Sequence, residues 1–161
     1  MKQKTLVLLL KAVIIGVAVC AALVYCLIVP ELGESLANAG DGEFSHLYTP
    51  WLAVILLTAP PVGAALVLSW IVATNIGKDR SFCRQNARFL ALISLLAGID
   101  TVYFLLASAV LMAVTKVGHP GVVLFILLVC FVGAAICVAA AALSHYAAKA
   151  AELQEQSDLT I

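Results

Sequence analysis

The chain has 161 residues, of which 64% are hydrophobic and 11% are charged, with nine basic and nine acidic side chains. Soluble globular domains carry about 25% charged residues, so this composition excludes an ordinary water-soluble domain. The formal net charge of zero argues against direct binding of nucleic acid, because that would require a clustered basic surface.

Four apolar segments are each long enough to cross a bilayer as a helix, which takes about 20 residues. They predict an all-α fold, a single domain that forms a four-transmembrane-helix bundle. The segments occupy most of the chain and leave no room for a separate soluble catalytic domain. The expected spans are residues 6–29, 51–76, 89–114 and 121–145.

The first span is expected to be retained, because its apolar run is too long for the core of a signal peptide. Lys11 lies inside this run, and its long side chain is expected to reach the headgroups. Residues 30–50 follow and contain no lysine or arginine. They are interpreted as an acidic outer loop, with Glu31, Glu34, Asp41 and Glu43.

The second span contains Pro60 and Pro61, which have no backbone N–H and so remove helical hydrogen bonds in mid-membrane. We expect a kink at this point, with side chains such as Thr58 satisfying the freed carbonyl groups. The kink has two interpretations, a packing feature or part of a ligand site, and packing is the simpler one.

Residues 77–88 join the second and third spans and form the only strongly polar, basic run between two apolar segments. Gly77 is expected to end the second helix and Ser81 to cap the third. The simplest interpretation is topological, because cations keep a loop in the cytoplasm and contact anionic headgroups. This explains the arginines of the turn, but it explains the polar pair Gln85 and Asn86 less well.

The third span contains Asp100, about 18 Å past Arg88 along a helix and therefore near mid-membrane. An ionised carboxylate is unfavourable there, so such residues face the bundle interior, are paired or protonated, and are candidates for function. Thr58 is expected at a similar depth, and Lys11 several Å closer to the cytoplasm. Two interpretations stay open for Asp100: a protonated carboxyl that fixes helix register, and ion or proton handling.

The fourth span ends in an alanine-rich half, where small residues recur four apart, as in the pairs Gly133 with Cys137 and Ala140 with Ser144. This spacing permits close packing of helices. Residues 146–161 follow as a polar tail that is acidic towards its end, with Glu152, Glu155 and Asp158.

The basic residues predict the orientation, because cytoplasmic segments of membrane proteins are enriched in lysine and arginine. With the amino terminus inside, Lys116 alone lies outside. We therefore expect both termini, the turn 77–88 and the tail 146–161 to be cytoplasmic. The basic residues on the inner side are then Lys2, Lys4, Lys11, Lys78, Arg80, Arg84, Arg88 and Lys149.

Neither catalysis nor metal binding has a visible basis in the sequence. The five cysteines include no Cys-x-x-Cys pair, and the three histidines are expected at separate places. No phosphate-binding glycine loop and no Ser-His-Asp set is present. The chain is interpreted as a non-enzymatic protein without a metal or another cofactor.

Two stretches of the sequence are distinctive: Gly77 with Arg80-Ser81-Phe82-Cys83-Arg84-Gln85-Asn86-Ala87, and Glu155-Gln156-Ser157-Asp158-Leu159-Thr160-Ile161. At these residues the chain resembles the bacterial membrane proteins of domain-of-unknown-function family 2975. The resemblance covers essentially the whole chain, and its specific parts are Phe82 with Asn86 and the last four residues. Many members have Glu at the position of Gln85, so the resemblance gives that position no charged role here.

The resemblance implies no established activity. Genes of this family often lie beside one for a small helix-turn-helix regulator of the Cro/repressor type, which suggests that a regulator and a membrane protein act as a pair.

We therefore expect a multi-pass protein of the bacterial plasma membrane with a regulatory or accessory role. The turn 77–88 and the tail are expected to form one cytoplasmic face that binds a protein partner, with a helix-turn-helix regulator as the candidate. The lipid bilayer is its other partner, and a homo-oligomer is compatible with these features. The alternative is a small transporter or ion-coupled permease subunit that uses Asp100. The candidate partner-binding residues are Arg80, Phe82, Arg84, Gln85, Asn86, Asp158 and Leu159.

Overall fold

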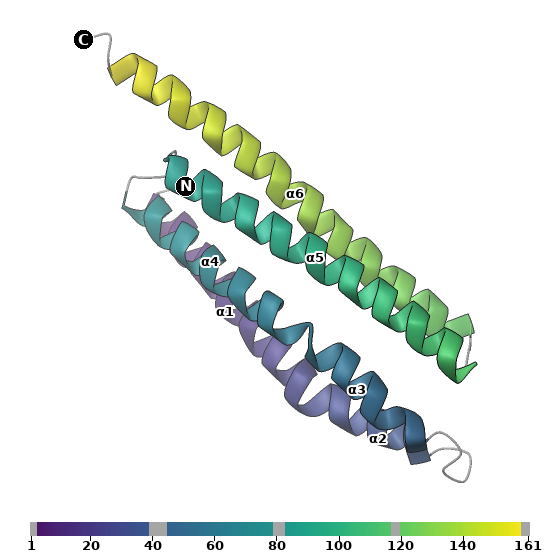
Figure 1. The fold of residues 1–161 in the computed structure, drawn as a ribbon. Helices are drawn as coiled ribbons and strands as arrows, with labels where there is room; N and C mark the ends of the chain where they lie inside the picture. The colour runs from purple at the N-terminus through teal and green to yellow at the C-terminus, as the bar shows by residue number, and fades with distance from the viewer. Residues whose placement is uncertain (1–2, 39–44, 79–82, 117–119, 159–161) are drawn as a thin grey trace.

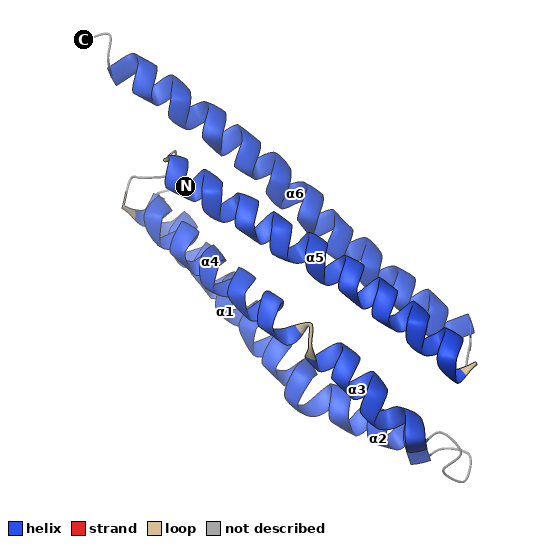
Figure 2. Ribbon diagram, viewed as in Figure 1, coloured by secondary structure: helices blue, strands red, loops and turns tan. Residues whose placement is uncertain are grey.

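The computed structural model describes residues 3–38, 45–78, 83–116 and 120–158, and helices account for nearly all of them (Figure 2). Within these ranges, four helical segments are long and apolar enough to cross a membrane. They confirm the predicted all-α class with four helices that are able to span a membrane. The segments are Lys4–Ser35, Ser45–Gly77, Arg84–Thr115 and Pro120–Gln156.

The main contacts join spans that follow one another in the chain (Figure 1). Helix α1 packs on α4, α4 on α5, and α5 on α6, while α2 packs on α3 and α3 on α5. We call the end where α1 begins, α4 ends, α5 begins and α6 ends the terminal end. In chain order the elements are α1 (Gln3–Leu23), η1 (Val24–Ile28), α2 (Val29–Asn38), η2 (Ser45–Leu47), α3 (Tyr48–Leu56), α4 (Ala59–Gly77), α5 (Arg84–Thr115) and α6 (Pro120–Asp158).

The helices continue past several ends of the expected spans. Residues 30–50 are not a simple loop, because α2 continues to Asn38 and α3 begins at Tyr48. The tail 146–161 is helical as far as Asp158, since its alanine, glutamate, leucine and glutamine residues favour a helix although they are not all apolar. Helix α4 ends at Gly77, as expected.

The first span passes Pro30 without a break because the turn before it is wider than an α-helical turn. Proline has no N–H, and its ring crowds the carbonyl group four residues earlier. In the π-helical turn η1, the Val29 N–H bonds to the Val24 carbonyl, five residues back. The wider turn lets the helix continue into α2.

The second span is interrupted just before Pro60 and Pro61, as expected, because α3 ends at Leu56 and α4 begins at Ala59. The Thr58 hydroxyl donates a 2.7 Å hydrogen bond to the Ile55 carbonyl. The same oxygen forms a second 2.7 Å hydrogen bond with the Tyr25 hydroxyl. Thr58 thus satisfies the Ile55 carbonyl rather than the Leu56 and Leu57 carbonyls that the two prolines leave without donors, which differs from the expectation. It also ties the interruption to η1 in the first span.

Small residues let α5 and α6 pack closely. The Ser94 hydroxyl donates a 2.8 Å hydrogen bond to the Cys137 carbonyl, so a side chain of one helix reaches the backbone of the other. Gly133 faces Thr101, and a methyl group at Gly133 would collide with the Thr101 hydroxyl. The predicted small-residue face of the fourth span therefore packs against α5.

Gly133 offers a direct test of this packing. Gly133→Ala should lower the free energy of unfolding by about 1–3 kcal/mol, because the added methyl group overpacks the interface with Thr101. The measurement is equilibrium unfolding in mixed micelles. Gly63→Ala is the matched control, since a methyl group there meets nothing within 4 Å. Equal losses in the two variants would contradict the packing argument.

Candidate functional site

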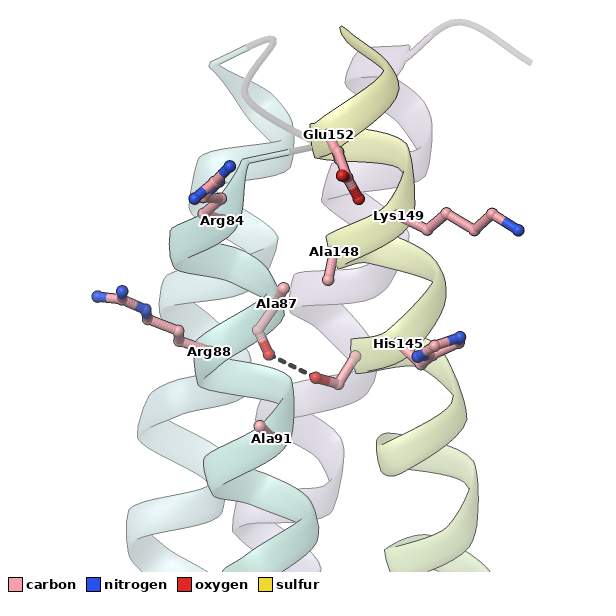
Figure 3. A pocket seen from close by; sticks show the side chains of 9 residues that line it. Arg84, Ala87, Arg88, Ala91, His145, Ala148, Lys149 and Glu152 are labelled. Atoms are coloured by element: carbon pink, nitrogen blue, oxygen red, sulfur yellow. Dashed lines mark hydrogen bonds between the residues drawn. The ribbon is translucent and has the colours of Figure 1, made fainter. Parts of the chain in front are cut away.

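An open groove of about 710 Å³ runs between α5 and α6 at the terminal end (Figure 3). Alanines of both helices form its floor, and their small side chains leave space between the helices. The Ser144 hydroxyl donates a 2.8 Å hydrogen bond to the Ala87 carbonyl across this floor. The lining residues are Arg84, Ala87, Arg88 and Ala91 of α5 and Ser144, His145, Ala148, Lys149 and Glu152 of α6.

The charged side chains stand at the margins of the groove rather than on its floor. In Figure 3, Arg84 and Arg88 extend from α5 on one side, and His145 and Lys149 extend from α6 on the other. Glu152 lies one turn further along α6. The groove therefore combines a narrow apolar floor with cationic margins and one carboxylate.

The groove depends on helix ends that lie beyond the expected spans. The backbone of Cys83 is extended, and its carbonyl accepts hydrogen bonds from the N–H groups of Asn86 and Ala87 at 3.0 and 3.3 Å. Cys83 is therefore the N-cap of α5, which corrects the expectation for Ser81, a residue outside the described ranges. On the α6 side of the groove, helix α6 extends beyond the first turn of α5 (Figure 1).

One ion pair connects the start of α5 with the last turns of α6. Arg84 Nη2 donates a 2.8 Å hydrogen bond to Glu155 Oε2. The two side chains are 67% and 55% exposed, and exposed pairs of this kind contribute about 0–1 kcal/mol. The pair adds little stability, but it places part of the basic turn beside the acidic tail.

Asn86 does not lie at this groove. Its side chain is 1% exposed, and its Oδ1 accepts a 2.8 Å hydrogen bond from Asn75 Nδ2 of α4. This burial removes Asn86 from the surface that a partner could contact and makes it a link between α4 and α5. The neighbouring Gln85 is exposed.

The remaining candidates at this end are only partly described. Arg80, Phe82 and Leu159 lie outside the described residues. Asp158 is the last residue of α6, and its side chain is not described. Arg88 and Lys149, which line the groove, were not among the candidate partner-binding residues, because their convergence depends on how α5 and α6 pair.

Asp100 lies near the middle of α5 and is half-buried. Its Oδ1 is buried and has no hydrogen-bond partner, and Ser108 Oγ is the other such side-chain atom in the described part of the chain. Thr58, expected at a similar depth, bonds to Tyr25 and Ile55. Tyr25 was not predicted; its signal is a phenol within an apolar run.

Lys11 likewise makes its contact with another residue, not with Asp100. Its Nζ lies 4.9 Å from the centre of the Trp70 ring, a cation–π geometry. Among the described residues, no three histidine, cysteine, aspartate or glutamate side chains are grouped so that they could hold a metal ion.

The neighbours Asn86 and Gln85 separate a packing role from a surface role. Asn86→Ala should lower the free energy of unfolding by about 1–3 kcal/mol, because it leaves the partly buried Asn75 amide without this acceptor. Gln85→Ala, on the exposed side, should change it by less than about 0.5 kcal/mol. Both values come from unfolding in mixed micelles, and a neutral Asn86→Ala would refute the assigned packing role.

Comparison with protein families gives one finding. The model of a family described as a protein of unknown function (DUF2975) matches residues 33–161, which include most of α2 and all of α3 to α6. Comparisons with curated proteins and with solved structures give no match.

Proposed function

The chain belongs to the DUF2975 family of proteins of unknown function, and from this premise we propose that it is a regulatory or accessory membrane protein, not an enzyme. Its terminal end lies in the cytoplasm and binds a soluble protein partner. The observation that carries this proposal is the groove between α5 and α6. The end of the groove nearest the start of α5 lies beside the Arg84–Glu155 ion pair.

The distribution of charge supports a cytoplasmic terminal end. Arg84, Arg88 and Lys149 all line the groove, whereas Lys116 lies at the opposite end of α5. Lysine and arginine are enriched on the cytoplasmic side of membrane proteins. Together with the family resemblance, this supports the proposal that the protein lies in the bacterial plasma membrane with both termini inside.

The shape of the groove favours a helical partner. A partner helix can lie along the alanine floor, because small side chains allow two helices to approach closely. Acidic side chains of that helix would meet Arg88 and Lys149, and a basic side chain would meet Glu152. A small helix-turn-helix regulator, the partner that the family resemblance suggests, consists of helices of suitable size.

Filling the floor tests this proposal. Ala148→Trp should weaken binding of the regulator by at least about tenfold, because the indole occupies the space that the partner helix needs. Ala148 is exposed, so the substitution is tolerated by the fold. The measurement is a binding titration of purified regulator against the detergent-solubilised protein, supported by co-purification.

The matched control is Ala142→Trp, which places the same side chain on an exposed position of α6 outside the groove. It should leave binding unchanged. If Ala148→Trp binds as tightly as wild type, or if no regulator co-purifies with the wild type, partner binding at this groove is wrong.

Transport is a second candidate function, favoured by Asp100. A buried carboxylate oxygen without a hydrogen-bond partner is unfavourable in a membrane, and acidic residues in this position commonly handle ions or protons. The interruption between α3 and α4 lies in a neighbouring span, and discontinuous helices form the ion sites of many transporters.

If this second function is correct, Asp100→Asn should abolish a pH-dependent ion flux in proteoliposomes, because the amide cannot exchange a proton or carry a charge. Gln85→Ala, an exposed change outside the membrane core, should keep the flux. A wild-type protein without flux, or a fully active Asp100→Asn, would remove transport as a candidate.

A further inference from the structure

The register between α4 and α5 fixes the depth of Asp100. Asn75 and Asn86 form a hydrogen bond, and the two helices run in opposite directions. Asp100 lies 14 residues after Asn86, and Pro61 lies 14 residues before Asn75, which is about 21 Å in each case. Asp100 is therefore level with the helix interruption, which Figure 1 shows beside the middle of α5.

The direction in which the Asp100 side chain points follows from the same hydrogen bond between Asn75 and Asn86. At 3.6 residues per turn, Asp100 points within about 40° of Asn86, which faces α4. Phe104 points in the same direction as Asn86 and is buried. Ser94, which bonds to α6, points about 80° to the other side. Asp100 therefore lies on the α4 side of α5, where the interruption is.

The interruption presents hydrogen-bond acceptors rather than donors. Because Pro60 and Pro61 have no N–H, the carbonyl groups of Leu56 and Leu57 lack the donors that an α-helix would supply four residues later. The same two prolines remove donors from the first turn of α4. The negative end of the α3 dipole lies here beside the positive end of the α4 dipole, so the two dipoles largely offset each other. The carbonyl oxygens of Leu56 and Leu57 can still bind a cation, whereas they cannot bind an anion.

A second helix irregularity lies at the same level, in the first span. The π-helical turn η1 contains Tyr25, whose hydroxyl bonds to Thr58 inside the interruption. Lys11, the nearest basic residue of the first span, lies 14 residues from Tyr25, or about 21 Å along the helix, and packs on Trp70. It is therefore too far away to neutralise Asp100.

We propose that the Asp100 carboxylate and the carbonyl groups of Leu56 and Leu57 bind a small monovalent cation, Na⁺, in the middle of the membrane. Oxygen ligands suit hard cations of this kind. One carboxylate balances one positive charge, whereas a divalent ion would leave an uncompensated charge in the low-dielectric interior. A proton competes for the same carboxylate. The inference rests on the second candidate function, because it names the ion that Asp100 handles.

Ion binding is measured separately from flux, on the full chain in detergent. The unfolding temperature, followed by tryptophan fluorescence, is compared in NaCl and in choline chloride of equal ionic strength over a range of pH. Na⁺ should raise the unfolding temperature of the wild type, because a ligand that binds the folded state stabilises it. The rise should grow with pH as the competing proton is lost, and it should be absent in Asp100→Asn.

Pro61→Ala keeps the carboxylate and tests the backbone ligand. The alanine N–H can donate to the Leu57 carbonyl, which removes that carbonyl from the cation and should weaken the apparent affinity for Na⁺ by about tenfold or more. Its unfolding temperature in choline chloride should not fall, because the helix gains a hydrogen bond. Pro50→Ala is the control, since Pro50 lies in the first turn of α3, away from the interruption.

Equal unfolding temperatures of the wild type in Na⁺ and choline at every pH would overturn the proposal. So would a full Na⁺ shift in Asp100→Asn, or an unchanged Na⁺ affinity in Pro61→Ala. A Na⁺ shift that depends on Asp100 in a protein without ion flux would support the site and remove only the transport function.

Discussion

A membrane interior has no water to satisfy a backbone carbonyl group, and this constraint shapes the first two spans. Pro30 and the pair Pro60 and Pro61 each remove donors that a helix would use. The chain meets the first loss with a widened turn. Beside the second, the Thr58 hydroxyl bonds to the Ile55 carbonyl, and the Tyr25 hydroxyl joins the two sites. The irregular parts of the two helices are thus one connected feature at one depth.

Helix α5 relates this feature to the rest of the molecule, because it packs against both neighbouring spans. On one side Asn86 bonds to α4, and on the other Ser94 bonds to the backbone of α6. Asp100 belongs to the first side and the groove at the terminal end to the second. The two proposed functions therefore use different faces of one helix, and a substitution on one face leaves the other face in place.

The number of spans, their helical class and the interruption at Pro60 are predictable from the sequence, because lipid demands long apolar runs and proline has no N–H. The ends of the helices are not predictable in this way, since hydropathy ends the fourth apolar segment at 145 although residues up to Asp158 continue the helix. Likewise, Asn86 looks like a surface residue until Asn75 of the neighbouring helix pairs with it. Contacts between helices set these outcomes, and spacing within one helix does not reveal them.

The order of the spans has a consequence for how the protein is made. Because contacts join successive spans, each helix that leaves the ribosome finds one partner, the preceding span, already in the membrane, although α5 packs most extensively on α6, which follows it. Closing such local contacts requires only short loops, which favours fast assembly. The small-residue face of α6 is the last of these surfaces to be covered, so the groove is completed only after α6 has been made.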